Sequence, residues 1–198
     1  VMVTCRGTPR EMGRQYGEQA REAIQTNVAM WGDSRFPASV SYQKHVHTVL
    51  EKYTPAILEE MQGLAEAADV SLPSIFLMNH FNTFEGNAPS PGCTSVVIND
   101  GPIIGKNNDI QFDGRRHVIR TSYPDDGLPM IQITHAGWLS GQDSMNGEGL
   151  TCTHNSAGSQ FDRTGERLDL RMWGYHLMRT CRTTDALVEG LSRVPTTV

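Results

Sequence analysis

The sequence predicts an α+β protein in which helices and an antiparallel sheet form separate layers. Apolar residues recur at helical spacing through most of the first 85 residues. From Cys93 onward the chain changes to short β-branched or alternating segments separated by turn signals, and helical spacing returns after residue 167. Blocks of helices, strands and helices are typical of a layered α+β architecture, and 198 residues suffice for one domain with a substantial core.

The first helix is predicted to begin after Thr8. Thr8 can cap it, Pro9 suits the first helical position, and Glu11 can complete a capping box. The apolar residues that follow recur at every fourth position: Met12, Tyr16, Ala20, Ile24 and Val28. This spacing puts them on one face of a helix.

Two further helices are predicted before residue 85. The first covers 43–68 with a break at Thr54-Pro55, because proline cannot continue a helix in its interior. The second begins at Ser71-Leu72-Pro73, and 31–41 is expected to be a loop. On this basis the whole first part is expected to be helical, and the composition changes at 84–86.

The strands are predicted in two hairpins followed by single strands. A Pro/Ser/Gly loop at 87–92 leads into 93–98, whose β-branched run predicts a buried strand with Cys93 as its first residue. A turn signal at 99–101 leads into the return strand 103–107, and a second hairpin joins 117–123 to 128–135. The segments 136–147 and 150–155 are expected to contain further strands, and helices are expected at 168–181 and 183–191.

Composition excludes several classes of function. The net charge is −5, and no basic cluster is present that would attract nucleic acid. No apolar run approaches the length of a membrane span, and no charged start with an apolar core predicts a signal peptide, so we expect a cytoplasmic protein whose natural N-terminus can precede Val1. The four cysteines are too few and too scattered for a disulfide scaffold, and their spacing does not favour a zinc or redox site.

Cys93 allows two interpretations from the residues alone. A single free cysteine is most often a small buried hydrophobic residue. A cysteine that begins a strand directly after a strained loop is also well placed for chemistry, and the hairpin can bring Lys106 and Asp109 back towards it.

Four short segments carry a resemblance that favours the second interpretation. They are GCTS at 92–95, GKNND at 105–109, MNGEGL at 145–150 and HNSA at 154–157. In this order and spacing the chain resembles the N-terminal-nucleophile hydrolases, and more narrowly the penicillin acyl-CoA acyltransferase family, peptidase family C45. The bile-salt hydrolase and penicillin V acylase group is a related branch. The resemblance extends over nearly the whole chain.

The resemblance implies a four-layer αββα sandwich and a processed chain. Residues 1–92 would be a helical pro-region or α-subunit, and 93–198 would begin the catalytic domain without completing it. Family members cut their own chain before the cysteine, here between Gly92 and Cys93. The new α-amine, whose ordinary pKa is about 7.7–8.0, can then act as the base for the thiol of the same residue.

Four other residues are expected at the site. By resemblance, Asp109 would hold the α-amine in place, and Asn155 would help to hold the oxyanion. Lys106 stands where the bile-salt hydrolase group has an arginine and the acyltransferase has a neutral residue, so it is either a cation of the substrate pocket or a solvated surface lysine. His154 is expected in the pocket wall and not as a catalyst.

The leading functional hypothesis is a self-processing cysteine amidase or acyltransferase that acts on small N-acyl amides. Its partners would be a small-molecule amide, with an acyl thioester donor as an alternative, and its own cleaved N-terminal part, which would stay associated. A homo-oligomer is left open, and no cofactor or metal is expected. The competing hypotheses are a non-catalytic binding or structural protein on the same scaffold and a redox or metal protein that uses the cysteines.

Overall fold

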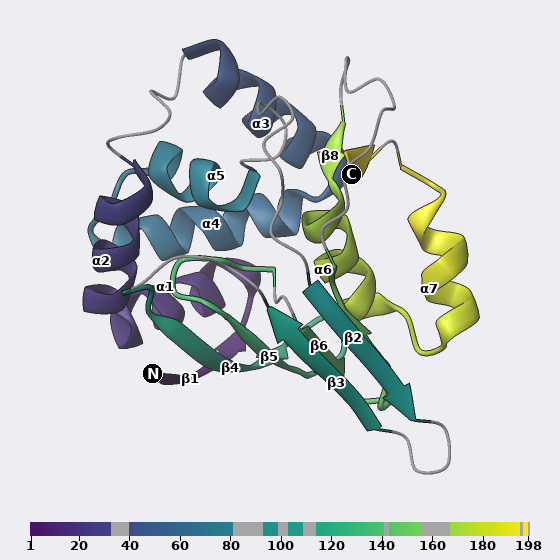
Figure 1. Cartoon of the computed structure of the whole chain (residues 1–198). Coiled ribbons are helices and arrows are strands. Elements are labelled where there is room, and N and C mark those ends of the chain that lie inside the picture. The colour runs from purple at the N-terminus through teal and green to yellow at the C-terminus, as the bar shows by residue number, and fades with distance from the viewer. Residues whose placement is uncertain are drawn as a thin grey trace.

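Helices cover one face of a five-stranded mixed sheet, and a separate two-stranded hairpin lies on the other (Figure 1). The computed structural model describes residues 1–32, 40–80, 93–98, 103–108, 114–140, 143–155, 167–194 and 196–197. The protein is therefore α+β, as the sequence predicts. Along these described ranges, no helix has the length and apolar character needed to cross a membrane.

The first part of the chain contributes one strand and five helices, which are β1 (Met2–Gly7), α1 (Pro9–Gln19), α2 (Arg21–Gly32), α3 (Val40–Tyr53), α4 (Pro55–Ala68) and α5 (Leu72–His80). The break at Thr54-Pro55 and the start of α1 are confirmed. Thr8 accepts a hydrogen bond from the Glu11 amide, and the Glu11 carboxylate accepts one from the Thr8 amide, which completes the capping box.

The prediction of an entirely helical first part is wrong at β1. Val3 and Cys5 are buried while their neighbours are exposed, and the strand pairs in parallel with β4 (His117–Pro124). A six-residue segment at the start of a chain has too little pattern to predict such a distant partner. Helices α2 and α3 also extend into the segment 31–41 that was expected to be a loop, of which 33–39 lies outside the described residues.

The rest of the main sheet comes from the second half of the chain. The sheet order is β1-β4-β5-β6-β7, with β5 at Met130–His135, β6 at Asp143–Asn146 and β7 at Thr151–Thr153, and all pairs except β1–β4 are antiparallel. A two-stranded ladder of β8 (Leu168–Asp169) and β9 (Thr196–Thr197) flanks α6 (Leu170–Thr180), and α7 spans Thr184–Leu191. Helix α6 thus begins two residues later than predicted, with Asp169 as its cap.

The hairpin of β2 (Cys93–Ile98) and β3 (Ile103–Asn108) forms where it was predicted, but the expectation of a buried strand is wrong. Val96, Val97 and Ile98 are 55%, 62% and 49% exposed, and Ile103 and Ile104 across the hairpin are also exposed. The hairpin forms its own sheet and contacts the main sheet through polar side chains near its open end. Its apolar residues lie toward the turn, beyond those contacts.

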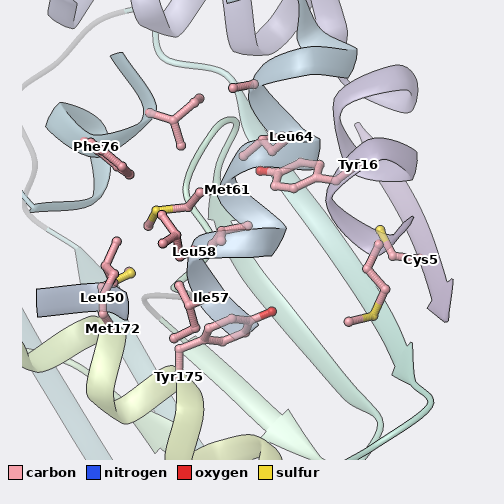
Figure 2. Close-up of a cluster of buried hydrophobic side chains, with 14 of the residues drawn as sticks. Cys5, Tyr16, Leu50, Ile57, Leu58, Met61, Leu64, Phe76, Met172 and Tyr175 are labelled. Carbon is pink, nitrogen blue, oxygen red and sulfur yellow. The ribbon is translucent and has the colours of Figure 1, made fainter. Parts of the chain in front are cut away.

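Helices α1 and α4 cross at unusually close range because glycines lie at the contact. A Cβ atom at Gly13 would lie 2.0 Å from the carbonyl oxygen of Glu60, and one at Gly63 would lie 2.3 Å from that of Arg10. The two backbones therefore touch directly. Figure 2 shows the apolar side chains packed around α4, with Tyr16 from α1 and Met172 and Tyr175 from α6.

A buried charge cluster joins α4, β4 and α6 inside this core. The Glu60 carboxylate, fully buried, is paired with Arg120 and Arg179, and the Tyr175 hydroxyl lies 3.1 Å from both of its oxygens. Burial alone would raise the pKa of Glu60, but the charges of Arg120 and Arg179 outweigh it and hold the pKa below its usual value. The cluster fixes the helical layer to the inner face of the sheet.

Candidate active site

The register of the hairpin places four polar side chains next to one another. Cys93 lies opposite Asn108, and Ser95 lies opposite Lys106. These four side chains are half-buried, whereas Thr94 and Asn107 between them are exposed. Alternation along a strand thus turns the thiol and its polar neighbours to the face of the hairpin that meets β6 and β7.

Ser95 and Asn155 are joined by a hydrogen bond across the two sheets. The Ser95 hydroxyl donates to Oδ1 of Asn155 at 3.0 Å and lies 3.2 Å from the Thr153 hydroxyl. Because the single Ser95 proton goes to Asn155, Thr153 must donate to Ser95. Oδ1 of Asn155 is therefore an acceptor, and Nδ2 is the end of the amide that can donate.

The Lys106 ammonium reaches across to the end of β7. It donates to Oδ1 of Asn155 and to the backbone carbonyl of His154. The lysine is half-buried, and its ammonium is bound to two acceptors. Its cation fixes the orientation of the Asn155 amide and brings a positive charge between the two sheets.

Asn108 connects the thiol to a carboxylate on β6. The Cys93 thiol donates to Oδ1 of Asn108 at 3.8 Å, and Nδ2 of Asn108 donates to Asp143 at 3.5 Å. Burial raises the pKa of Asp143, against the opposing effects of the Lys106 charge and the Asn108 hydrogen bond. The second oxygen of Asp143 is buried and has no hydrogen-bond partner among the described residues.

His154 is neutral at physiological pH. Burial, followed by the charge of Arg171, lowers its pKa to about 4, with Lys106 adding to the effect and Asp169 opposing it. A base with this pKa is not matched to proton transfer near pH 7. Its backbone carbonyl, not its ring, accepts the hydrogen bond from Lys106.

Of the residues singled out in the sequence, hydrogen bonds join Lys106 to Asn155 and to the His154 carbonyl, and Cys93 lies on the same face of the hairpin as Lys106. Gly92 and Asp109 lie outside the described residues. Three members of the cluster were not predicted: Ser95, Asn108 and Asp143. Alternation from Cys93 could have identified Ser95, and hairpin register could have identified Asn108, but only the tertiary fold places Asp143 here.

The remaining cysteines lie in other settings. Cys5 is fully buried, and Cys152 and Cys181 are half-buried free thiols. Burial and the nearby carboxylate of Asp143 raise the pKa of Cys152, which makes it a poor nucleophile at neutral pH. Within the described ranges, no three His, Cys, Asp or Glu side chains are placed to share a metal ion.

Comparison with known proteins gives a distant, partial match. No model of a known protein family matches the chain. The chain is 26% identical over 166 residues to the acyl-coenzyme A:6-aminopenicillanic-acid-acyltransferase 40 kDa form of Emericella nidulans. The match covers 78% of this chain and 46% of the relative, so the chain spans less than half of that protein.

Proposed function

We propose that this protein is a self-processing cysteine amidase or acyltransferase of the N-terminal-nucleophile class, cut between Gly92 and Cys93. The observation that carries the proposal is the position of Cys93. Cys93 begins strand β2, and its thiol donates to the Asn108 amide on the face of the hairpin that also carries Ser95 and Lys106. A free thiol among oriented polar groups is suited to nucleophilic chemistry.

The proposed reaction uses one residue as nucleophile and base. The α-amine of the freed Cys93 takes the proton of its thiol, and the sulfur attacks the acyl carbonyl carbon. The bond from that carbon to the leaving amine or thiol breaks, and the leaving group takes the proton back from the α-ammonium. Water or an acceptor amine then attacks the acyl-cysteine, loses its proton to the α-amine, and releases the acyl product with the thiol restored.

Asn155 is the proposed donor to the oxyanion. Ser95 and Lys106 both occupy its Oδ1, so the amide presents Nδ2 as its donor end. An oriented donor stabilises the charge that develops on the carbonyl oxygen in the transition state. Lys106 accordingly acts through Asn155, and Asp109 is proposed to hold the α-amine.

The proposed four-layer fold draws support from the outer face of the main sheet. Ile119, Ile131, Ile133 and Met145 are 41%, 40%, 51% and 47% exposed on the side where the hairpin lies. A sheet with one face under helices and an apolar opposite face is suited to packing against a second sheet. The cut N-terminal part would remain bound, because β1 pairs with β4 and α1 lies in the shared core.

The proposed substrates are small. The relative's name describes transfer of an acyl group from coenzyme A to an amine, so an acyl thioester donor and an amine acceptor head the panel to be tested. N-acyl amino acids and penicillins complete it. A site between two sheets would exclude folded polypeptides, and proteolysis is not part of the proposal.

Cys93→Ala, with Cys181→Ala as the matched control, tests the proposal. Both positions hold half-buried free thiols, but only Cys93 lies in the polar cluster. Cys93→Ala is expected to abolish chain cutting and turnover, and Cys181→Ala to preserve both. Turnover of small amides or thioesters by Cys93→Ala at the parent rate would refute the proposal. A chain that is cut before Cys93 but turns over no substrate of the panel would favour a non-catalytic scaffold.

A further inference from the structure

Two residues outside the predicted site form a hydrogen-bonded line that ends at the Cys93 sulfur. Asn108 lies directly across the hairpin from Cys93, and its amide is in contact with both the thiol and the Asp143 carboxylate. Asp143 is the first residue of β6 and comes from a segment far along the chain. Neither residue is needed to hold the hairpin together, because backbone pairing does that.

The carboxylate determines which end of the Asn108 amide faces the thiol. An ionised carboxylate only accepts hydrogen bonds, so Nδ2 of Asn108 must face Asp143 and Oδ1 must face Cys93. Oδ1 can accept the S–H proton of a thiol, but it presents a lone pair to a thiolate. A hydrogen bond made only to the protonated form favours that form.

We propose that Asn108 and Asp143 are positioning residues that hold the Cys93 thiol protonated and aimed until its base removes the proton. We call them the Asn108–Asp143 pair. To donate to a thiolate, the Asn108 amide would have to turn over and abandon Asp143. The pair therefore sets the pH at which Cys93 becomes reactive, and the inference rests on the proposed role of Cys93 as nucleophile.

Three other titratable groups lie on or next to β3 and β7. Lys106 lies on β3, Cys152 on β7 and His154 directly after β7. The Lys106 charge acts on both Asp143 and His154, and the Asp143 charge acts on Cys152. Because Asp143 also carries a charge that opposes a thiolate, the test must separate its charge from its effect on the Asn108 amide.

The test is the pH profile of Cys93 alkylation by iodoacetamide, quantified by mass spectrometry on the peptide that contains Cys93. Asp143→Asn removes the charge and lets Asn108 turn over. Asn108→Leu removes the amide and leaves the Asp143 charge in place. Asn107→Leu is the matched control, since it makes the same change at the adjacent position, on the other face of β3.

Both Asp143→Asn and Asn108→Leu are expected to move the midpoint of the profile down by roughly one pH unit, the size expected for one hydrogen bond. Asn107→Leu is expected to leave it in place. A midpoint in Asn108→Leu equal to that of the parent would overturn the inference, and a shift confined to Asp143→Asn would assign the whole effect to charge. Alkylation needs no turnover and is measurable in cut and uncut chains. Failure of this inference can therefore be distinguished from failure of the proposed activity.

Discussion

Replacing Glu60 by Gln is expected to destabilise the protein far more than the same change elsewhere on α4. Glu60 is fully buried and is the shared counter-charge of Arg120 and Arg179. Gln keeps the size of the side chain and one acceptor oxygen but removes the charge. Two guanidinium groups, with side chains 0% and 8% exposed, would then lack compensation.

The expected loss follows from what is known of broken buried ion pairs. Removing one partner costs about 3–5 kcal/mol, because the other charge is left buried. For a chain of this size each kcal/mol lowers the melting temperature by about 2–4 °C, which gives a decrease of roughly 6–20 °C. The Glu60 pKa is held below its usual value, so this stabilisation is present above the ordinary carboxylate range and disappears as pH falls through the lowered pKa.

Glu66→Gln is the matched control. Glu66 lies on α4 like Glu60 and pairs with Arg10 of α1, but the two side chains are 53% and 46% exposed. Such surface pairs contribute about 0–1 kcal/mol. Urea unfolding of both variants gives their free energies of unfolding, provided that the dependence of this free energy on urea concentration has the same slope in both. Equal free energies of unfolding for Glu60→Gln and Glu66→Gln would refute the reasoning.

Four further variants test the helix contact in the core, the buried His135 and the candidate site. Gly13→Ala is expected to lose about 1–3 kcal/mol of stability, because its Cβ would collide with the α4 backbone. Its control, Gly174→Ala, has nothing within 4 Å of the added Cβ and is expected to gain up to about 1 kcal/mol. Equal unfolding midpoints for the two variants would contradict the close helix contact. Burial, followed by the Arg115 charge, lowers the pKa of His135 to about 3. Below pH 6.5 the unfolded chain therefore binds more protons at this residue than the folded chain does, and the free energy of unfolding decreases as the pH is lowered. His135→Gln should reduce that slope by about 1.4 kcal/mol per pH unit between pH 6.5 and roughly 4.5, and an unchanged slope would exclude the buried neutral imidazole. Asn155→Ala should lower kcat about 10²–10³-fold, because it removes the proposed oxyanion donor. The unfolding midpoint should not change, since the residue is exposed. An undiminished kcat would show that Asn155 is not part of the oxyanion site.

Local signals predicted most elements of the fold. The capping box at Thr8 and the break before Pro55 determined where α1 and α4 begin, and turn signals located both hairpins. Strand β1 was missed because its only strong feature is a parallel pairing with β4, more than 100 residues away. Burial of 94–98 was wrongly predicted because β-branched residues favour strands whether or not another layer covers them.

The candidate site was predictable only where it is local. Cys93 and Lys106 lie on one hairpin, and Asn155 follows a short strand that the sequence also indicated. The contact of Asn108 with Asp143 depends on how the hairpin sits on the main sheet, which no local pattern encodes. The amide orientation of Asn155 likewise depends on donors from the opposite sheet.

The intact mass of the purified protein tests the central claim most directly. The account predicts two associated fragments, the second beginning at Cys93, whose masses sum to that of the precursor plus one water. The same measurement on Cys93→Ala should show a single uncut chain. A parent protein that remains whole across the bond between Gly92 and Cys93 while turning over substrate at full rate would contradict the account.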